Sequence, residues 1–188
     1  MNGFIIGENQ YGQPCPYESA KAQCDPHVPK MTCETIQTVV QAALSAGVPP
    51  ELMPLTKTTG KPHRGGYKHH PVVVWAGESL SNWIWMLFHA DALCDQFLIR
   101  YGKEHFGRSQ VDALFKAFTW EDYLPNLPMT PFARCFNQSK GENLDLLDED
   151  KYSIVEAYRL FYQRDKASFA KWERGVPAPD WWKMEVIV

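Results

Sequence analysis

The chain lacks the features that mark membrane-spanning and secreted proteins. Its 188 residues contain no long hydrophobic run: a stretch such as 71–77 is far shorter than the roughly 20 residues that a spanning helix needs. No basic segment followed by a long apolar stretch opens the sequence, so we expect no secretory signal. The five cysteines are odd in number and scattered, which does not suggest a disulfide framework. We therefore expect one globular domain, residues 1–188, located in the cytoplasm.

Several common catalytic motifs are also missing. The sequence contains no Walker loop, no G-x-G-x-x-G and no G-x-S-x-G, which removes the commonest nucleotide-binding and hydrolase patterns. Cys24, His27 and Cys33 lie close together in the chain, but their spacing matches no C-x-x-C or H-E-x-x-H pattern. Zinc binding is therefore a minor alternative, and we expect neither a metal nor a cofactor.

The charge is unevenly distributed along the chain. Residues 141–156 hold six acids and one base, a net charge of −5, so the rest of the chain carries +2 within the total of −3. We interpret residues 141–152 as an acidic loop and residues 48–77 as a basic loop rich in glycine and histidine. The basic loop is either a solvated loop or one that faces an anion, because Gly65 and Gly66 allow close backbone approach. The charge total therefore does not exclude binding to DNA.

Hydrophobic periodicity predicts an all-α fold, a single compact domain with about four main helices and long loops. Ser79 is a suitable N-cap and Gly102 a suitable C′ glycine for the longest helix. Only residues 4–6 and 72–74 look β-like, and each stretch is too short to form a sheet. The predicted helices cover residues 30–46, 79–101, 109–118 and 153–174.

The start of the first predicted helix combines several reactive side chains. Lys30 and Glu34 are four residues apart and share a helix face, with His27 just before the helix. A carboxylate beside an amine suits imine chemistry, because protons must move while the amine attacks an electrophilic carbon. The alternative is an ordinary surface helix start with a Glu–Lys pair.

Asp91 falls on the apolar line of the second predicted helix. A carboxylate at such a position needs a partner or a shifted pKa, so it belongs either to a buried structural pair or to a site. The pair is the favoured interpretation, and the partner types nearby in the chain are Arg100, Lys103 and His105.

Basic and aromatic side chains alternate in two further stretches. His69 and His70 follow Lys68, and this group could contact phosphate or form an ordinary turn. The fourth predicted helix presents a face that would suit base stacking beside a phosphate track, although such a stripe is more often core. The residues on this face are Arg159, Tyr162, Lys166 and Phe169.

Two stretches resemble pyrimidine-dimer DNA glycosylases of the phage endonuclease V type. Residues 66–71 read G-Y-K-H-H-P, like that family's G-Y-[RK]-x-H-P stretch, and His27 precedes Glu34 by seven residues, as in its first helix. This resemblance covers roughly the first 105 residues. The whole chain is more similar to a group of mostly uncharacterised phage proteins. The shared motifs are C-D-x-H-V-x-K-M (24–31), H-P-x-x-x-W (70–75), E-S-x-x-N-W-x-W (78–85), R-Y-G-K-x-H (100–105), T-P-F-A (130–133) and A-Y-R-x-F-Y (157–162).

The resemblance implies an all-α enzyme that acts on a pyrimidine in duplex DNA. In that family an N-terminal amine attacks the sugar C1′ to form an imine, a glutamate assists, β-elimination cleaves the strand, and a base is flipped out. Transferred to this sequence, Glu34 is the acid/base and His27 its helper. The family's amine belongs to a threonine exposed by removal of the initiator methionine. Here the bulky Asn2 leads us to expect that Met1 stays, and Lys30 is the alternative imine former.

The leading hypothesis is therefore a phage-type, pyrimidine-specific DNA glycosylase and lyase, with DNA or a pyrimidine nucleotide as partner. One alternative is an enzyme that modifies a substituted pyrimidine in DNA or in nucleotides. Another is a non-catalytic module that binds nucleic acid or protein. The expected catalytic residues are Glu34, His27, Lys30 and Met1. The expected substrate-binding residues are Arg64, Lys68, His69, His70, Asn82, Arg100, Lys103, His105 and Arg159.

Overall fold

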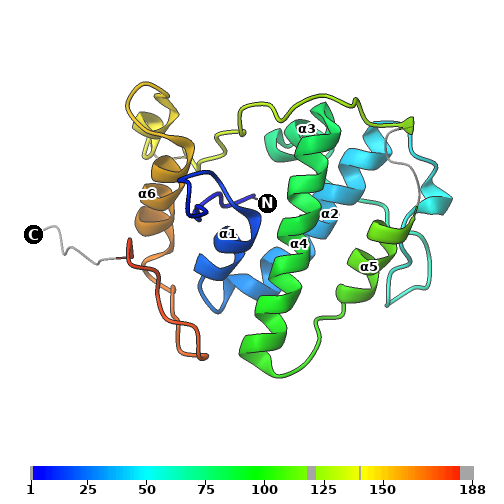
Figure 1. Ribbon diagram of the computed structural model, residues 1–188, viewed down its shortest axis with the longest axis horizontal. Coiled ribbons are helices and arrows are strands. Elements are labelled where there is room, and N and C mark those ends of the chain that lie inside the picture. Colours follow the sequence, from blue (N-terminus) through cyan, green and yellow to red (C-terminus); the bar gives the residue numbers. More distant parts are fainter. Residues whose placement is uncertain (1, 118–121, 140, 183–188) are drawn as a thin grey trace, which may run out of the picture.

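A computed structural model describes residues 2–117, 122–139 and 141–182 of the chain. Within these ranges the chain forms six α-helices and no β-strand (Figure 1), which confirms the predicted all-α class. None of the described helices is long and apolar enough to cross a bilayer. The helices are α1 (Pro16–Ala22), α2 (His27–Ser45), α3 (Pro71–Glu78), α4 (Leu80–Tyr101), α5 (Arg108–Lys116) and α6 (Ile154–Lys166), with 3₁₀ turns η1 (Pro50–Leu52) and η3 (Leu144–Leu147).

Helix α4 runs through the middle of the molecule and packs against α1 and α2 (Figure 1). Both of its ends lie where the sequence predicts. The Ser79 hydroxyl accepts a hydrogen bond from the Asn82 N–H at 3.1 Å, and Gly102 takes the left-handed conformation with φ of 66°. Across the contact with α2, the indole of Trp83 donates to the carbonyl of Val39 at 2.9 Å. Local capping signals therefore set the length of the central helix.

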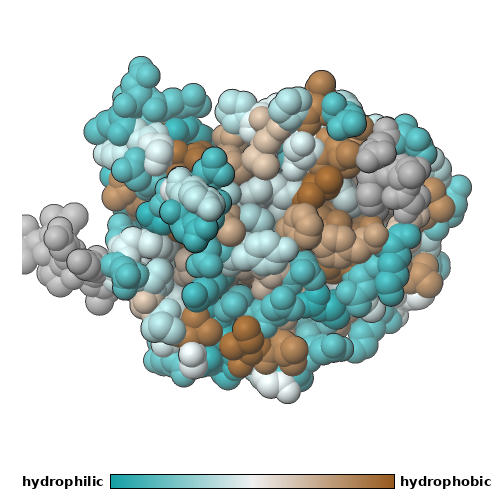
Figure 2. Space-filling view, viewed as in Figure 1, coloured by the Kyte–Doolittle hydropathy of each residue, from teal (hydrophilic) through white to brown (hydrophobic). Residues whose placement is uncertain are grey.

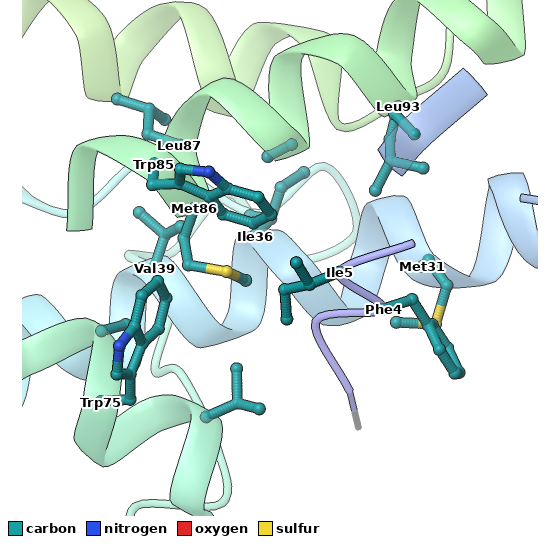
Figure 3. Packing of buried hydrophobic residues seen from close by; sticks show 14 of the residues in the cluster. Phe4, Ile5, Met31, Ile36, Val39, Trp75, Trp85, Met86, Leu87 and Leu93 are labelled. Atoms are coloured by element: carbon teal, nitrogen blue, oxygen red, sulfur yellow. The ribbon is translucent and has the colours of Figure 1, made fainter. Parts of the chain in front are cut away.

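The β-like prediction for residues 4–6 is wrong, because these residues form an irregular, buried segment. Phe4, Ile5 and Ile6 are 4%, 2% and 0% exposed, and Figure 3 shows Phe4 and Ile5 beside α2. The Ile6 carbonyl accepts a hydrogen bond from Arg159 Nε at 3.0 Å, so a side chain replaces a strand partner. The Phe4 ring stacks on that of Phe161 in α6 at 6.2 Å. The segment is thereby held between α2 and α6.

The β-like prediction for residues 72–74 is also wrong, because they lie in α3. The helix begins there since His70 Nδ1 accepts a hydrogen bond from the Val72 N–H at 3.3 Å, and Pro71 occupies the first helical position. The predicted basic loop of residues 48–77 therefore ends at His70 and contains η1. Its last part lies directly on α2, since a Cβ on Gly65 would approach the Cα of Gln41 to 2.8 Å.

Residues 122–139 form an extended strap that crosses α3 and α4 on its way to α6 (Figure 1). Asn82 fixes its middle, since it accepts from the Thr130 N–H at 3.0 Å and donates to the Thr130 hydroxyl at 2.7 Å. The hydroxyl of Tyr158 in α6 donates to the Ala133 carbonyl at 2.7 Å. These two anchors position the end of the strap, residues 134–138, near α2 and α6.

Helix α6 ends at Lys166, eight residues before the predicted end at residue 174. After one turn, in which the Ala170 N–H still donates to the Lys166 carbonyl at 2.9 Å, the chain makes tertiary contacts. The Asp25 N–H donates to the Lys171 carbonyl at 2.8 Å, and the Glu173 N–H donates to the Asp25 carboxylate at 2.6 Å. These contacts outweigh the helical periodicity of the sequence beyond Lys166.

The acidic loop, residues 141–152, is folded around η3 and tied to arginines. Asp145 receives two hydrogen bonds from Arg164 of α6, at 2.8 and 3.0 Å. Arg134 of the strap lies 3.6 Å from a carboxylate oxygen of Glu149 and also donates to two backbone carbonyls. Part of the strong local negative charge is thus balanced within the fold.

Asp91 forms a structural pair, but its partner differs from those predicted. The guanidinium of Arg108, at the start of α5, donates to the carboxylates of both Asp91 and Asp95. Arg108 lies 17 residues further along the chain, beyond the end of α4, and only the packing of α5 on α4 brings it close. The pair therefore joins two helices.

Apolar side chains also reach the surface over the upper half of α4 in the view of Figure 2. Ile84 of α4 is 36% exposed and Leu127 of the strap is 54% exposed. Nearby, the rings of Phe88 and Phe115 lie 5.6 Å apart and join α4 to α5. The main cluster of titratable side chains lies away from this surface, between α2 and α6.

Candidate active site

A pocket of about 500 Å³ lies between the N-terminal segment, α2, the first residues of α3, the end of the strap and α6. Helix α2 contributes His27, Lys30 and Glu34, which share one face because they are three and four residues apart. His70 enters from the start of α3 and Lys166 from the end of α6. Four of the predicted site residues are thus brought together with a lysine that was not among them.

Lys30 and Glu34 form the ion pair that their spacing predicts. Lys30 Nζ lies 3.6 Å from Glu34 Oε1, with the lysine side chain 62% exposed and that of the glutamate 21% exposed. The amine therefore sits at the solvent rim of the pocket, and the carboxylate sits deeper. Glu34 is well placed to exchange a proton with a group bound in the pocket.

His27 is buried beside this pair and is uncharged near neutral pH. Burial first, and then the positive charges of Lys166 and Lys30, lower the pKa of His27 to about 3. Its Nδ1 lies 2.7 Å from the hydroxyl of Tyr162, which also accepts a hydrogen bond from the Cys24 N–H at 3.0 Å. With Nδ1 engaged in the protein interior, Nε2 is the ring nitrogen left for a ligand.

Lys166 projects from the last turn of α6 into an aromatic environment. Its Nζ lies 5.0 Å from the centre of the Phe161 ring and 5.9 Å from that of Phe4, and its side chain is 20% exposed. Burial lowers the pKa of Lys166, and the negative charge of Asp165 offsets part of this effect. The sequence placed Lys166 on a face with Tyr162, but nothing in the chain order connected that face to His27.

The beginning of the chain also reaches the pocket. Asn2 lines it, donating through Nδ2 to the Cys135 carbonyl at 2.7 Å and accepting from the Phe4 N–H at 3.2 Å. Met1, the predicted source of the amine, lies outside the described residues. Burial lowers the pKa of His70, which also lines the pocket and whose Nδ1 caps α3.

Four predicted substrate-binding residues lie on the surface outside the pocket. Lys68 and His69 line a separate hollow of about 380 Å³ between α3 and the end of α2. Arg64 lines another, of about 450 Å³, next to η1. Lys103 is exposed in the turn after α4. Since Lys68 and His69 directly precede His70, the basic loop adjoins the pocket without lining it.

Arg100 is engaged inside the protein. Its side chain is 0% exposed, with Nη1 3.0 Å from Asp25 Oδ1 and 2.7 Å from the Gln23 carbonyl. It also donates to the Lys21 carbonyl and to Gln96. The guanidinium therefore ties α4 to the turn between α1 and α2.

Asn82, His105 and Arg159 also make internal contacts. Asn82 is fully buried and holds the strap. His105 is 4% exposed, and its Nδ1 accepts from the Gly107 N–H at 3.0 Å. Arg159 pairs with Glu8 at 2.9 Å. These three side chains fix the scaffold around the N-terminal segment, the strap and the turn before α5.

No group of three or more His, Cys, Asp or Glu side chains in the described ranges could hold a metal ion. Cys24 is buried, with its Sγ 3.2 Å from the Tyr162 hydroxyl, whereas Cys33 is exposed and lies 3.8 Å from His105 Nε2. The two thiols therefore do not converge with His27 on one point.

The pocket thus combines two primary amines, a carboxylate and a neutral imidazole beside aromatic rings. Such a set can form and break carbon–nitrogen bonds, because the amines can act as nucleophiles while the carboxylate moves protons. Neither a family model, nor a curated protein, nor a solved structure matches the chain.

Proposed function

We propose that the pocket is the active site of a phage-type DNA glycosylase and lyase that acts on a pyrimidine nucleotide in DNA through an imine. The observation that carries the proposal is the convergence of Lys30 and Lys166 with Glu34 and His27 around one pocket. The resemblance of residues 24–34 and 66–71 to pyrimidine-dimer glycosylases supports the same chemistry. The neighbouring surface bases Arg64 and Lys68 suit contacts to the phosphates of a long substrate.

The chemistry needs one amine and one proton carrier. A neutral amine attacks C1′ of the nucleotide, and the bond from C1′ to the base breaks, with its electron pair leaving on the base, which takes a proton from solvent. The attacking nitrogen passes one proton to Glu34, and Glu34 returns it to the ring oxygen as the bond between C1′ and that oxygen opens. A protonated imine remains. Loss of a proton from C2′ then expels the 3′ phosphate, which cleaves the strand.

His27 suits a supporting role in these steps. A neutral imidazole next to two lysines adds no further positive charge and so does not hinder the approach of a protonated group. Through Nε2 it can hydrogen-bond the sugar or the leaving base, while Tyr162 holds the other side of the ring. The aromatic ring of Phe4 stacks on His27 at 5.0 Å and shields it from water.

The test is strand cleavage on duplex oligonucleotides that carry a pyrimidine dimer or an abasic site, with borohydride present to reduce any imine. We expect a covalent protein–DNA adduct and a cleaved strand. The Glu34→Gln variant should lose activity by roughly 100-fold or more, which is the usual effect of removing a general acid/base. Glu51→Gln, at an exposed acid of η1, is the matched control and should keep wild-type activity.

Two results would contradict the proposal. One is the absence of an adduct on every duplex, and the other is full activity of Glu34→Gln. Turnover of a substituted pyrimidine without strand cleavage would indicate a base-modification enzyme instead. Salt-sensitive DNA binding without turnover, weakened when Lys68 is neutralised, would indicate a non-catalytic binding module.

A further inference from the structure

We propose that the amine that forms the imine belongs to Lys166, at the end of α6. This inference rests on the proposed function and names the nucleophile of that site. Two lysines, Lys30 and Lys166, line the pocket together with Glu34. Their amines have very different surroundings, and this difference is the basis of the inference.

Lys30 is the more solvated of the two amines. Its side chain is 62% exposed, and its Nζ is held 3.6 Å from Glu34 Oε1. As a nucleophile it would stay in contact with bulk water and would have to leave its ion pair. Its position suits a different task, which is to orient Glu34 and to attract an anionic substrate to the rim of the pocket.

Lys166 is the more enclosed amine. Its side chain is 20% exposed, and its Nζ lies near the Phe161 and Phe4 rings. Its Nζ lies 3.9 Å from Oδ2 of Asp165. Oδ1 of the same carboxylate accepts a hydrogen bond from Asn143 at 3.1 Å, so Asp165 is also held by another partner.

Enclosure favours the reactive form of this amine. Burial lowers the pKa of Lys166, which raises the fraction of neutral amine at a given pH. Only the neutral amine has a lone pair for attack on carbon. Low exposure also protects an imine from hydrolysis before the strand is cleaved.

In the reaction described above, Lys166 Nζ is the attacking amine. Nζ forms a bond to C1′, the base leaves with the electron pair of its bond to C1′, and one Nζ proton passes to Glu34 and on to the sugar ring oxygen. On a substrate that is already abasic, Nζ adds to the aldehyde carbon, and the aldehyde oxygen leaves as water. Borohydride then delivers a hydride to the imine carbon and fixes the protein to the DNA.

The experiment locates the adduct. The wild-type protein is mixed with an abasic-site duplex and borohydride, the DNA is trimmed by nuclease, and the protein is digested and examined by tandem mass spectrometry. We expect the sugar remnant on Lys166. The Lys166→Arg variant keeps the positive charge next to the aromatic rings but cannot form an imine, so trapping should fall by at least 100-fold. Lys30→Arg should still carry the remnant on Lys166, and Lys116→Arg, an exposed lysine of α5, should trap like the wild type.

The outcomes separate this inference from the proposed function. A remnant on Lys30 or on the amino terminus, or undiminished trapping by Lys166→Arg, would overturn the assignment to Lys166 and leave the imine mechanism standing. No adduct in the wild type would overturn both. If Lys166→Arg shows no cooperative thermal transition, the position of the remnant in the wild type decides alone.

Discussion

Two regions of the molecule bury polar side chains, and they use them differently. The first, here the α1–α4 seam, consists of Gln23, Asp25, His89 and Arg100. His89 is fully buried, with Nδ1 2.9 Å from the Pro16 carbonyl and Nε2 3.1 Å from the Gln23 amide nitrogen. Each ring nitrogen thus has a partner within the protein.

The second region is the pocket between α2 and α6. His27 is almost as buried as His89, yet within the described ranges the only hydrogen bond of its ring is through Nδ1, to Tyr162. Lys30, Glu34 and Lys166 line the same open space. In the seam, the polar atoms of His89 and Arg100 have partners within the protein and hold helices together, whereas Gln23 Oε1 is buried without a hydrogen-bond partner in the described ranges. In the pocket, the titratable side chains line an open space, and this difference distinguishes the seam from the proposed site.

The largest expected effect is on the seam. Arg100→Met should lower the free energy of unfolding by about 3–5 kcal/mol, because it leaves the buried Asp25 carboxylate without its cation. Urea denaturation measures this change. If the free energy of unfolding were unchanged and only the salt dependence of DNA binding changed, Arg100 would be a DNA contact. The interpretation of the seam as a structural region would then be wrong.

A second variant tests the two histidines against each other. His89→Ala should lower the free energy of unfolding by about 3 kcal/mol, since it opens a cavity and removes the partners of Pro16 and Gln23. The folded variant should still form the trapped adduct. His27→Ala should show the opposite balance, with a smaller loss of stability and a large loss of adduct. Thermal melts together with trapping assays measure both properties.

Both histidines should also make stability depend on pH. Their pKa values in the folded protein are about 3 for His27 and about 4 for His89, below the ordinary value of 6.5. At pH values between the folded-state pKa of each histidine and 6.5, the unfolded chain binds more protons than the folded protein. The free energy of unfolding therefore falls as the pH falls below 6.5. At pH 5 each histidine should account for a loss of about 2 kcal/mol. Urea titrations at several pH values should show that the free energy of unfolding of His89→Gln depends less steeply on pH than that of the wild type. An unchanged pH dependence would contradict the burial of this ring.

The smallest expected change in stability compares Tyr162, whose buried hydroxyl contacts His27 of the pocket, with Tyr101 near the seam. Tyr162→Phe and Tyr101→Phe each remove hydrogen bonding to a buried partner, and each should cost about 1 kcal/mol. Only Tyr162→Phe should slow adduct formation, because its hydroxyl orients His27. Single-turnover trapping rates measure this, and equal rates for the two variants would remove the positioning role of Tyr162.

Features set by neighbouring residues could be predicted from the sequence. Helix α4 begins and ends as expected because Ser79 and Gly102 act locally. Helix α6 stops early because the residues after Lys166 bind the turn at Asp25, a contact that no local pattern reveals.

The residues of the candidate site also fall into two groups, those that sequence spacing brings together and those that only the fold brings together. Lys30 and Glu34 share one helix, so their spacing alone places them together, whereas His27, predicted to lie just before this helix, is its first residue. Lys166 and Asn2 join them only through the packing of α6 and the N-terminal segment. The substrate-binding predictions for Arg100 and Asn82 relied on residue type. Burial of these side chains depends on tertiary contacts that residue type does not report.

The most direct test of the account is the yield of borohydride-trapped adduct on an abasic-site duplex, compared between the wild type and Glu34→Gln. We expect a covalent adduct for the wild type and a yield at least 100-fold lower for Glu34→Gln, with both proteins equally folded. Equal yields, or no adduct from either protein, would contradict the claim that this pocket is an imine-forming active site.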